Sequence, residues 1–225
     1  MTLTLDAFRN AILNLSQELP LTANKFDKID RAIYRRMTTP ERIQRFLDDE
    51  VAYNNEPDGP SWKGPRMVIR NRLAHCMEGA LFAAAALRQL GHEPLLIDLE
   101  AVHDDDHVLA IFQQHGHWGA IGKSNYSGLR FREPVYRTLR ELAMSYFAHY
   151  FNLKGERTMR GYSTRPVNLR RFDSLEWMTA ERDLPEIPEY LCEIAHTPVI
   201  TPEMARRLSR MDRRLFDAGL CGTIK

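Results

Sequence analysis

The sequence predicts an α+β fold in which one apolar helix packs on a small antiparallel sheet. Residues 74–90, AHCMEGALFAAAALRQL, are rich in Ala and Leu, the strongest helix formers. Residues 94–99, 107–112 and 117–123 are short apolar runs bounded by turn signals, a pattern typical of strands. The turn at residues 113–116 predicts that the last two strands pair as an antiparallel hairpin.

The chain before this centre predicts further helices and one irregular connector. Apolar residues recur at helical spacing over residues 3–50. Within that range, Thr39 followed by Pro40 predicts an N-cap and the first residue of a helix. Residues 54–66 hold three prolines and two glycines, which indicates a connector lying immediately upstream of the apolar helix.

The chain after the centre predicts two more helices that enclose the sheet. Glu133 and Pro134 are expected to open a long helix that runs to about Asn152. Thr201 followed by Pro202 predicts a final helix. This last helix is expected to run to about Ala218, ended by Gly219, and residues 153–185 carry no clear periodicity. We therefore expect an N-terminal helical segment, a core and a C-terminal helical extension in one compact unit, at residues 1–53, 54–152 and 153–225.

Composition restricts the class of partner and the compartment. The formal net charge of +1 gives no electrostatic basis for binding nucleic acid or an anionic membrane. No apolar run approaches the ~20 residues of a membrane-spanning helix, and the first ten residues do not form a signal peptide. Three cysteines do not form a disulfide framework and fit a reducing compartment, so the cytoplasm is the expected location.

The order of elements in the centre predicts a cysteine nucleophile. Cys76 falls in the first turn of the apolar helix, where the positive end of the helix dipole favours thiolate over thiol. His107 begins a neighbouring strand, where its ring can act as base and later as proton donor. A polar group on the next antiparallel strand, after Trp118, can accept from the other ring nitrogen and fix the tautomer.

This arrangement resembles the transglutaminase-like superfamily of the papain-like fold over residues 70–126. The resemblance rests on Cys76, the helix ending Leu-Arg-Gln-Leu-Gly at residues 87–91, an apolar strand, His107 opening a strand, and the segment from Trp118. It implies acyl transfer through an acyl-thioester, with hydrolysis of a peptide, amide or isopeptide bond as the expected outcome. The implied partner is a peptide or small amide substrate, with no cofactor and no metal.

The third catalytic position differs from the family pattern, which has an Asp shortly after the Trp. No carboxylate follows Trp118 until Glu133. Asn125 is the preferred candidate, because an amide oxygen can orient an imidazole as a carboxylate does. Ser124 is the alternative on the opposite strand face. A carboxylate from residues 104–106 is a third possibility.

Other site residues follow from position or from the resemblance. The resemblance implies an oxyanion hole formed by the backbone N–H of Cys76 and a second donor, with Asn71 and Trp62 as candidates. His75, beside the nucleophile, and Asp106, beside His107, are candidate substrate-site residues. Trp118 and Ser124 complete that group.

Two other functions stay open. The first is a non-catalytic binding or scaffold protein of the same fold. The second is a metal-dependent hydrolase in which His103, His107 and the aspartates at 104–106 supply the ligands. Because three successive aspartates suit a polar loop better than a helix, the two histidines are not expected to share a helix face, and no metal is expected.

Overall fold

The computed structural model describes residues 25–223, so the helices predicted for residues 3–24 lie outside the described range. Within it, helices α2 (Lys28–Tyr34) and α3 (Pro40–Asp49) confirm the helical prediction for residues 25–50. Thr39 caps α3 as predicted, since its side chain accepts a hydrogen bond from the N–H of Arg42 at 3.2 Å.

The centre of the protein is a five-stranded antiparallel sheet in the order β6-β5-β4-β3-β8. Its strands are β3 (Leu95–Leu99), β4 (His107–Gln114), β5 (His117–Ile121), β6 (Arg132–Tyr136) and β8 (Val167–Asn168). The predicted hairpin is confirmed, because β4 and β5 pair antiparallel around a turn at residues 115–116. Two short sheets flank it, formed by β1 (Ala52–Tyr53) with β2 (Leu73–Ala74) and by β7 (Gly161–Ser163) with β9 (His196–Pro198).

Helices cover both faces of the central sheet. Successive side chains of β4 point to opposite faces and pack against different helices. Val108, Ala110 and Phe112 belong to the apolar cluster that contains helix α5 (Cys76–Gln89). Leu109 and Ile111 point to the opposite face and belong to the cluster that contains α6 (Leu139–Phe147). Both faces of β4 are therefore buried, which explains its nearly continuous apolar sequence.

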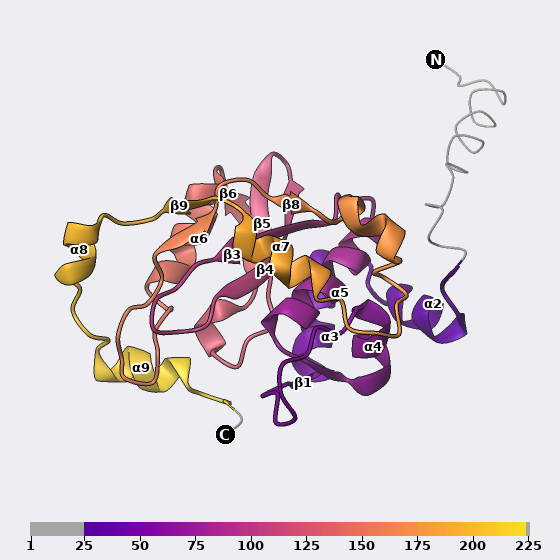
Figure 1. Cartoon of the computed structure of the whole chain (residues 1–225), viewed down its shortest axis with the longest axis horizontal. Coiled ribbons are helices and arrows are strands. Elements are labelled where there is room, and N and C mark those ends of the chain that lie inside the picture. Colours follow the sequence, from indigo (N-terminus) through magenta and orange to yellow (C-terminus); the bar gives the residue numbers. More distant parts are fainter. Residues whose placement is uncertain (1–24, 224–225) are drawn as a thin grey trace, which may run out of the picture.

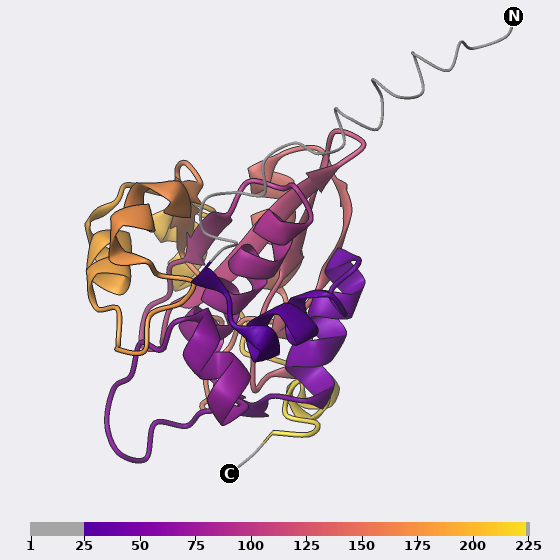
Figure 2. The ribbon, with the colours of Figure 1, turned by 90° about the vertical axis from the view of Figure 1, so that its right-hand side faces the viewer.

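Segments from the whole described chain build this core. Helices α3, α4 (Pro65–Asn71) and α5 gather beside the sheet, while α8 (Pro202–Arg206) and α9 (Arg213–Gly219) lie at the far end of the long axis (Figure 1). Figure 2 shows the same helical layer from the side. Helix α7 (Glu186–Glu193) and strand β8 bring the C-terminal segment onto the same core. Within the described residues, no helix is long and apolar enough to cross a membrane.

The prediction of a helix opening at Glu133 and Pro134 is wrong. These residues lie in β6, and α6 begins only at Leu139, where the side chain of Thr138 caps it. Proline lacks the N–H that a central strand needs, but β6 is the edge strand of the sheet, where this loss is tolerated.

The C-terminal predictions also need correction. The helix predicted from Pro202 to about Ala218 is divided into α8 (Pro202–Arg206) and α9 (Arg213–Gly219), because Asp212 acts as a second N-cap. Residues 153–185 contain β7, β8 and the 3-10 helix Leu169–Leu175, which the sequence pattern did not indicate.

A close contact in the first turns of α5 fixes how this helix meets the sheet. Gly79 lies against Lys123, two residues after the end of β5, and a Cβ atom at Gly79 would overlap with the Cβ of Lys123. The Lys123 ammonium is buried and donates to the carbonyl of Leu47 at 2.6 Å and to that of Val51. Glycine at position 79 is therefore needed for the start of α5 to approach this end of the sheet.

We predict that Gly79→Ala destabilises the protein although Ala is the better helix former. The overlap should cost about 1–3 kcal/mol of unfolding free energy, which outweighs a helix-propensity gain of about 1 kcal/mol. Urea unfolding followed by circular dichroism measures it. Gln89→Ala, at the other end of α5, is the control and should change stability by less than about 0.5 kcal/mol. A stabilising effect of Gly79→Ala would show that the contact is not close.

Candidate active site

Cys76 is the first residue of α5, and its neighbours form a capping box around it. His75 is the N-cap: its ring Nδ1 lies 3.3 Å from the N–H of Met77, and its own N–H donates to Glu78 Oε2 at 3.1 Å. The thiol therefore stands at the positive end of a 14-residue helix. Its own N–H is one of the donors that a helix start leaves without an intrahelical partner.

The fully buried carboxylate of Glu78 also fastens the connector at residues 54–66 to the start of α5. Its Oε1 accepts from the Ser61 hydroxyl at 2.8 Å and from the Lys63 N–H at 3.1 Å. Its Oε2 accepts from the side-chain amide of Asn54 at 3.4 Å. The connector predicted as irregular is thereby held as one wall of the site.

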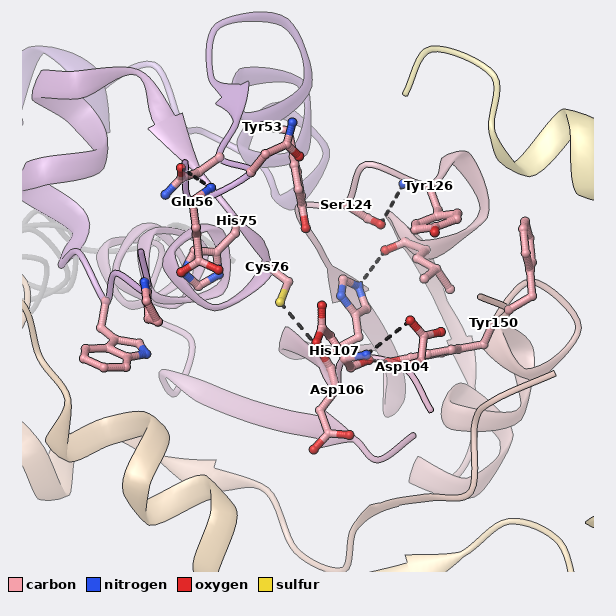
Figure 3. A pocket seen from close by; sticks show the side chains of 17 residues that line it. Tyr53, Glu56, His75, Cys76, Asp104, Asp106, His107, Ser124, Tyr126 and Tyr150 are labelled. Atoms are coloured by element: carbon pink, nitrogen blue, oxygen red, sulfur yellow. Dashed lines mark hydrogen bonds and ion pairs between the residues drawn. The ribbon is translucent and has the colours of Figure 1, made fainter. Parts of the chain in front are cut away.

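His107 begins β4 opposite Leu99 and is buried. Its Nε2 lies 2.8 Å from the carbonyl oxygen of Leu129. A carbonyl only accepts, so Nε2 carries a proton and Nδ1 is the ring nitrogen left for exchange with the thiol. The thiol of Cys76 also lies 3.8 Å from the backbone oxygen of Asp106 and points toward the His107 ring (Figure 3).

Both side chains open into a cavity of about 400 Å³. Of the predicted site residues, the cavity is lined by Trp62, His75, Cys76, Asp106, His107 and Ser124. A second cavity of about 150 Å³ borders Cys76 as well and is lined further by Asp98, Val108, Leu191 and Cys192. The thiol of Cys76 therefore lies between two spaces that can receive parts of a ligand.

The surroundings of Cys76 favour the thiolate. Burial alone raises the pKa of the thiol, but hydrogen bonds to His107 and His75 and the positive charges of the two rings outweigh it and lower the pKa to about 6. An ordinary cysteine has a pKa near ~8.5. At neutral pH Cys76 is therefore mainly ionised.

His75 supplies a second positive charge beside the thiolate. Its Nε2 lies 2.7 Å from the Ser61 carbonyl oxygen, 3.6 Å from a Glu56 carboxylate oxygen and 3.8 Å from one of Glu78. Burial lowers the pKa of the ring, but the hydrogen bond and charge of the Cys76 thiolate, the Glu78 charge and the Ser61 carbonyl raise it to about 9. The ring is then a cation at neutral pH, in which Nδ1 carries a proton and no longer accepts from the Met77 N–H, and its charge stabilises the thiolate.

Three predicted site residues do not line the cavity. The carbonyl of Leu129, rather than the side chain of Asn125, occupies Nε2 of His107, and Asn125 does not line the cavity. Trp118 pairs with Gln113 on β4, six residues from His107, which is about 20 Å along a strand.

Asn71, the third of these residues, is exposed at the last position of α4 and does not line the cavity, so Trp62 is the remaining oxyanion candidate. Ser124 lines the cavity, but its hydroxyl accepts from the N–H of Tyr126 at 3.0 Å.

Sequence reasoning missed several residues that shape the site. Tyr53, Glu56 and Tyr150 line the cavity from two separate parts of the chain. The hydroxyl of Tyr150 donates to the carbonyl of Asp105 at 2.6 Å and holds the loop that precedes His107. Only Glu56 had a sequence signal, because it belongs to the proline-rich connector that lies immediately before the helix of Cys76.

The metal alternative finds no support in the geometry. Among residues 25–223, no three His, Cys, Asp or Glu side chains are arranged to hold a metal ion. His103 lies in the loop after β3 with a positive φ of 58°, and His107 uses Nε2 for the Leu129 carbonyl.

Neither a scan against protein-family models nor a search of curated proteins gave a match for this sequence.

We predict that iodoacetamide labels Cys76 with a half-maximal rate near pH 6. Below that pH the thiol form dominates and the rate falls, while above it the thiolate fraction and the rate reach a plateau. Mass spectrometry of tryptic peptides over a pH series measures the rate at each cysteine. Cys192 is the internal control, because burial and the nearby Asp98 and Asp106 raise its pKa. A midpoint for Cys76 at or above pH 8 would contradict the proposed ionisation.

Proposed function

We propose that this protein is a cysteine-nucleophile acyltransferase of the transglutaminase-like type that hydrolyses an amide, peptide or isopeptide bond. The observation that carries the proposal is that the Cys76 thiol, at the first position of α5, opens into the same cavity as His107, whose Nε2 is bonded to the Leu129 carbonyl. These surroundings lower the pKa of the thiol to about 6. A lowered thiol pKa, a base and a cavity are the combination that nucleophilic catalysis requires.

The first half of the reaction uses the Cys76 thiolate, the two oxyanion donors and the proton on His107. Cys76 Sγ attacks the substrate carbonyl carbon, and the electron pair moves to the carbonyl oxygen. The free N–H of Cys76 at the helix start is placed to stabilise that oxyanion, with Trp62 as the second donor. The proton on Nδ1 of His107 passes to the leaving amine, the C–N bond breaks, and an acyl-thioester remains on Cys76.

The second half returns the enzyme to its starting state. His107, now neutral, accepts a proton from a water molecule at Nδ1 as the water oxygen attacks the thioester carbonyl. The carboxylic acid leaves, and the proton held at Nδ1 restores the thiolate–imidazolium pair. Throughout, Nε2–H stays bonded to the Leu129 carbonyl, which fixes the ring orientation.

The backbone carbonyl of Leu129 therefore takes the positioning role that family members give to a carboxylate. It holds the tautomer and the ring plane but carries no full charge, so it stabilises the imidazolium less than an aspartate does. The two histidines around Cys76 offset that loss, because His75 adds a second positive charge.

The order of elements supports the resemblance to the transglutaminase-like superfamily. The nucleophile opens α5, the next strand is β3, His107 opens β4, and β5 follows as its antiparallel partner. That is the order of elements on which the resemblance rests. A reducing compartment such as the cytoplasm suits the proposal, since Cys76, Cys192 and Cys221 are all free.

We predict that the protein forms a covalent acyl adduct when incubated with p-nitrophenyl acetate. Intact-mass spectrometry should show one added acetyl group, located at Cys76, with a burst of p-nitrophenolate. Cys76→Ala should abolish the adduct, and His107→Gln should slow its formation by about 100-fold or more. Cys192→Ser is the matched thiol control and should leave the burst unchanged.

Two outcomes would count against the proposal. Acylation of Cys192 or Cys221 instead of Cys76 would contradict it directly. An unreactive Cys76 in a folded protein would favour the non-catalytic binding protein of the same fold.

We also predict that Asn125→Ala changes the rate of Cys76 acylation by less than about threefold, because the Leu129 carbonyl and not Asn125 occupies Nε2 of His107. Stopped-flow measurement of p-nitrophenolate release provides the rate. A loss comparable to that of His107→Gln would show that Asn125 orients the base after all.

A further inference from the structure

Beyond the two histidines that lie beside Cys76, His75 and His107, the charged side chains of the cavity are all acidic. The large cavity is lined by the carboxylates of Glu56, Asp104, Asp105 and Asp106, and by no Lys or Arg of the described chain. The sequence as a whole holds 31 Lys and Arg against 30 Asp and Glu, so the site departs strongly from the average. A concave surface lined by one sign of charge concentrates ligands of the opposite sign.

Glu56 lies 3.6 Å from the His75 ring, whereas Asp104 and Asp106 receive only uncharged donors from the protein. Asp104 accepts from the Thr158 hydroxyl at 2.7 Å and from the N–H of Asp105 at 3.2 Å. Asp106 accepts from the N–H of Ala101 at 2.7 Å. Burial is the main reason that the pKa values of both carboxyls are raised. Their negative charge is therefore left without a neighbouring Lys or Arg.

The second cavity continues the same pattern. Asp106 lines it together with Asp98, whose side chain is only 4% exposed. One oxygen of Asp98 lies 3.0 Å from His196 Nε2, and the other is buried without a hydrogen-bond partner among the described residues. A buried carboxylate oxygen with an unused acceptor is costly unless a positive charge lies near it.

Aromatic rings complete the lining with a second kind of cation receptor. Tyr53, Trp62 and Tyr126 line the large cavity, and Trp62 lines the small one as well. The face of an aromatic ring attracts a cation, with indole the strongest of the three types. Carboxylates and aromatic rings together suit an ammonium or guanidinium group that is attached to an apolar stem.

We propose that the substrate of Cys76 is cationic, carrying an ammonium or guanidinium group such as that of a lysine, arginine or polyamine amide. The group enters between the carboxylates at residues 104–106 and Glu56, with the scissile carbonyl at the thiolate. The assignment of a substrate rests on the proposed acyl-transfer function, while the cation preference is a property of the cavities that exists without turnover.

The test measures how the charge of a small reagent affects its reaction with Cys76. In a Cys192→Ser/Cys221→Ser background, the probes are the trimethylammonium-ethyl and the sulfonatoethyl methanethiosulfonates. Each transfers its thioalkyl group to the thiolate and releases methanesulfinate. The ratio of the two second-order rates at pH 8 is compared with the same ratio for 2-mercaptoethanol, which removes the intrinsic difference between the reagents.

We expect the ratio at Cys76 to exceed that of 2-mercaptoethanol by about tenfold or more at low salt. Because added salt screens charges beyond a Debye length of about 10 Å at 0.1 M, the excess should shrink as ionic strength rises. Glu56→Gln and Asp104→Asn should each reduce it. Glu133→Gln, which removes an exposed carboxylate on β6 outside both cavities, is the matched control and should leave the ratio unchanged.

A ratio equal to that of 2-mercaptoethanol, a reversed ratio, or no reaction of Cys76 with either reagent would overturn the cationic substrate. The salt dependence needs no cavity variant, so the test stands even if a substituted protein fails to fold. Failure of the proposed acyl transfer is a separate result: the acetyl adduct at Cys76 would then be missing, whatever the charge preference.

Discussion

The capping box at the start of α5 is the interaction on which the site depends. Glu78 is fully buried, and it binds the N–H of His75, the hydroxyl of Ser61 and the N–H of Lys63 at once. This carboxylate thereby caps the N-terminus of α5 at His75, the residue before Cys76, and holds the proline-rich connector against the helix start. Without it, the helix start and the cavity wall would have no common anchor.

The electrostatics of the site are a balance between opposed effects. Burial and the surrounding carboxylates oppose a negative charge on Cys76, whereas His75, His107 and the helix dipole favour it. The histidines prevail, because together they lower the pKa of the thiol by more than burial raises it. The same lining then leaves an acidic space in front of an ionised nucleophile, which suits a cationic substrate.

Much of this fold follows from local sequence. The residues of α5 and the strands β3, β4 and β5 were predictable, because helix propensity and short apolar runs are properties of the segment itself. The start of β6 was not, since Pro134 is equally suited to a helix start and to an edge strand, and only the sheet order decides between them. Residues 1–24 lie outside what the structure describes.

The part of the candidate site that depends on the order of helices and strands could be predicted from the sequence. The pairing of Cys76 with His107 follows from the order of elements, and the structure brings both into one cavity. The hydrogen-bond partner of His107 could not be predicted from the sequence, because every residue has a backbone carbonyl and the identity of Leu129 does not mark it. The role of Glu78 was likewise hidden, since it depends on the connector folding back onto α5.

His107 and His75 lower the pKa of the Cys76 thiol to about 6, and an ultraviolet titration measures that ionisation directly. The thiolate absorbance of the Cys192→Ser/Cys221→Ser protein, minus that of the same protein with Cys76→Ser, isolates the ionisation of one thiol. The lowered pKa predicts a midpoint near pH 6 that moves to higher pH in His107→Gln. A midpoint near the ordinary cysteine value of ~8.5, unchanged by His107→Gln, would contradict it.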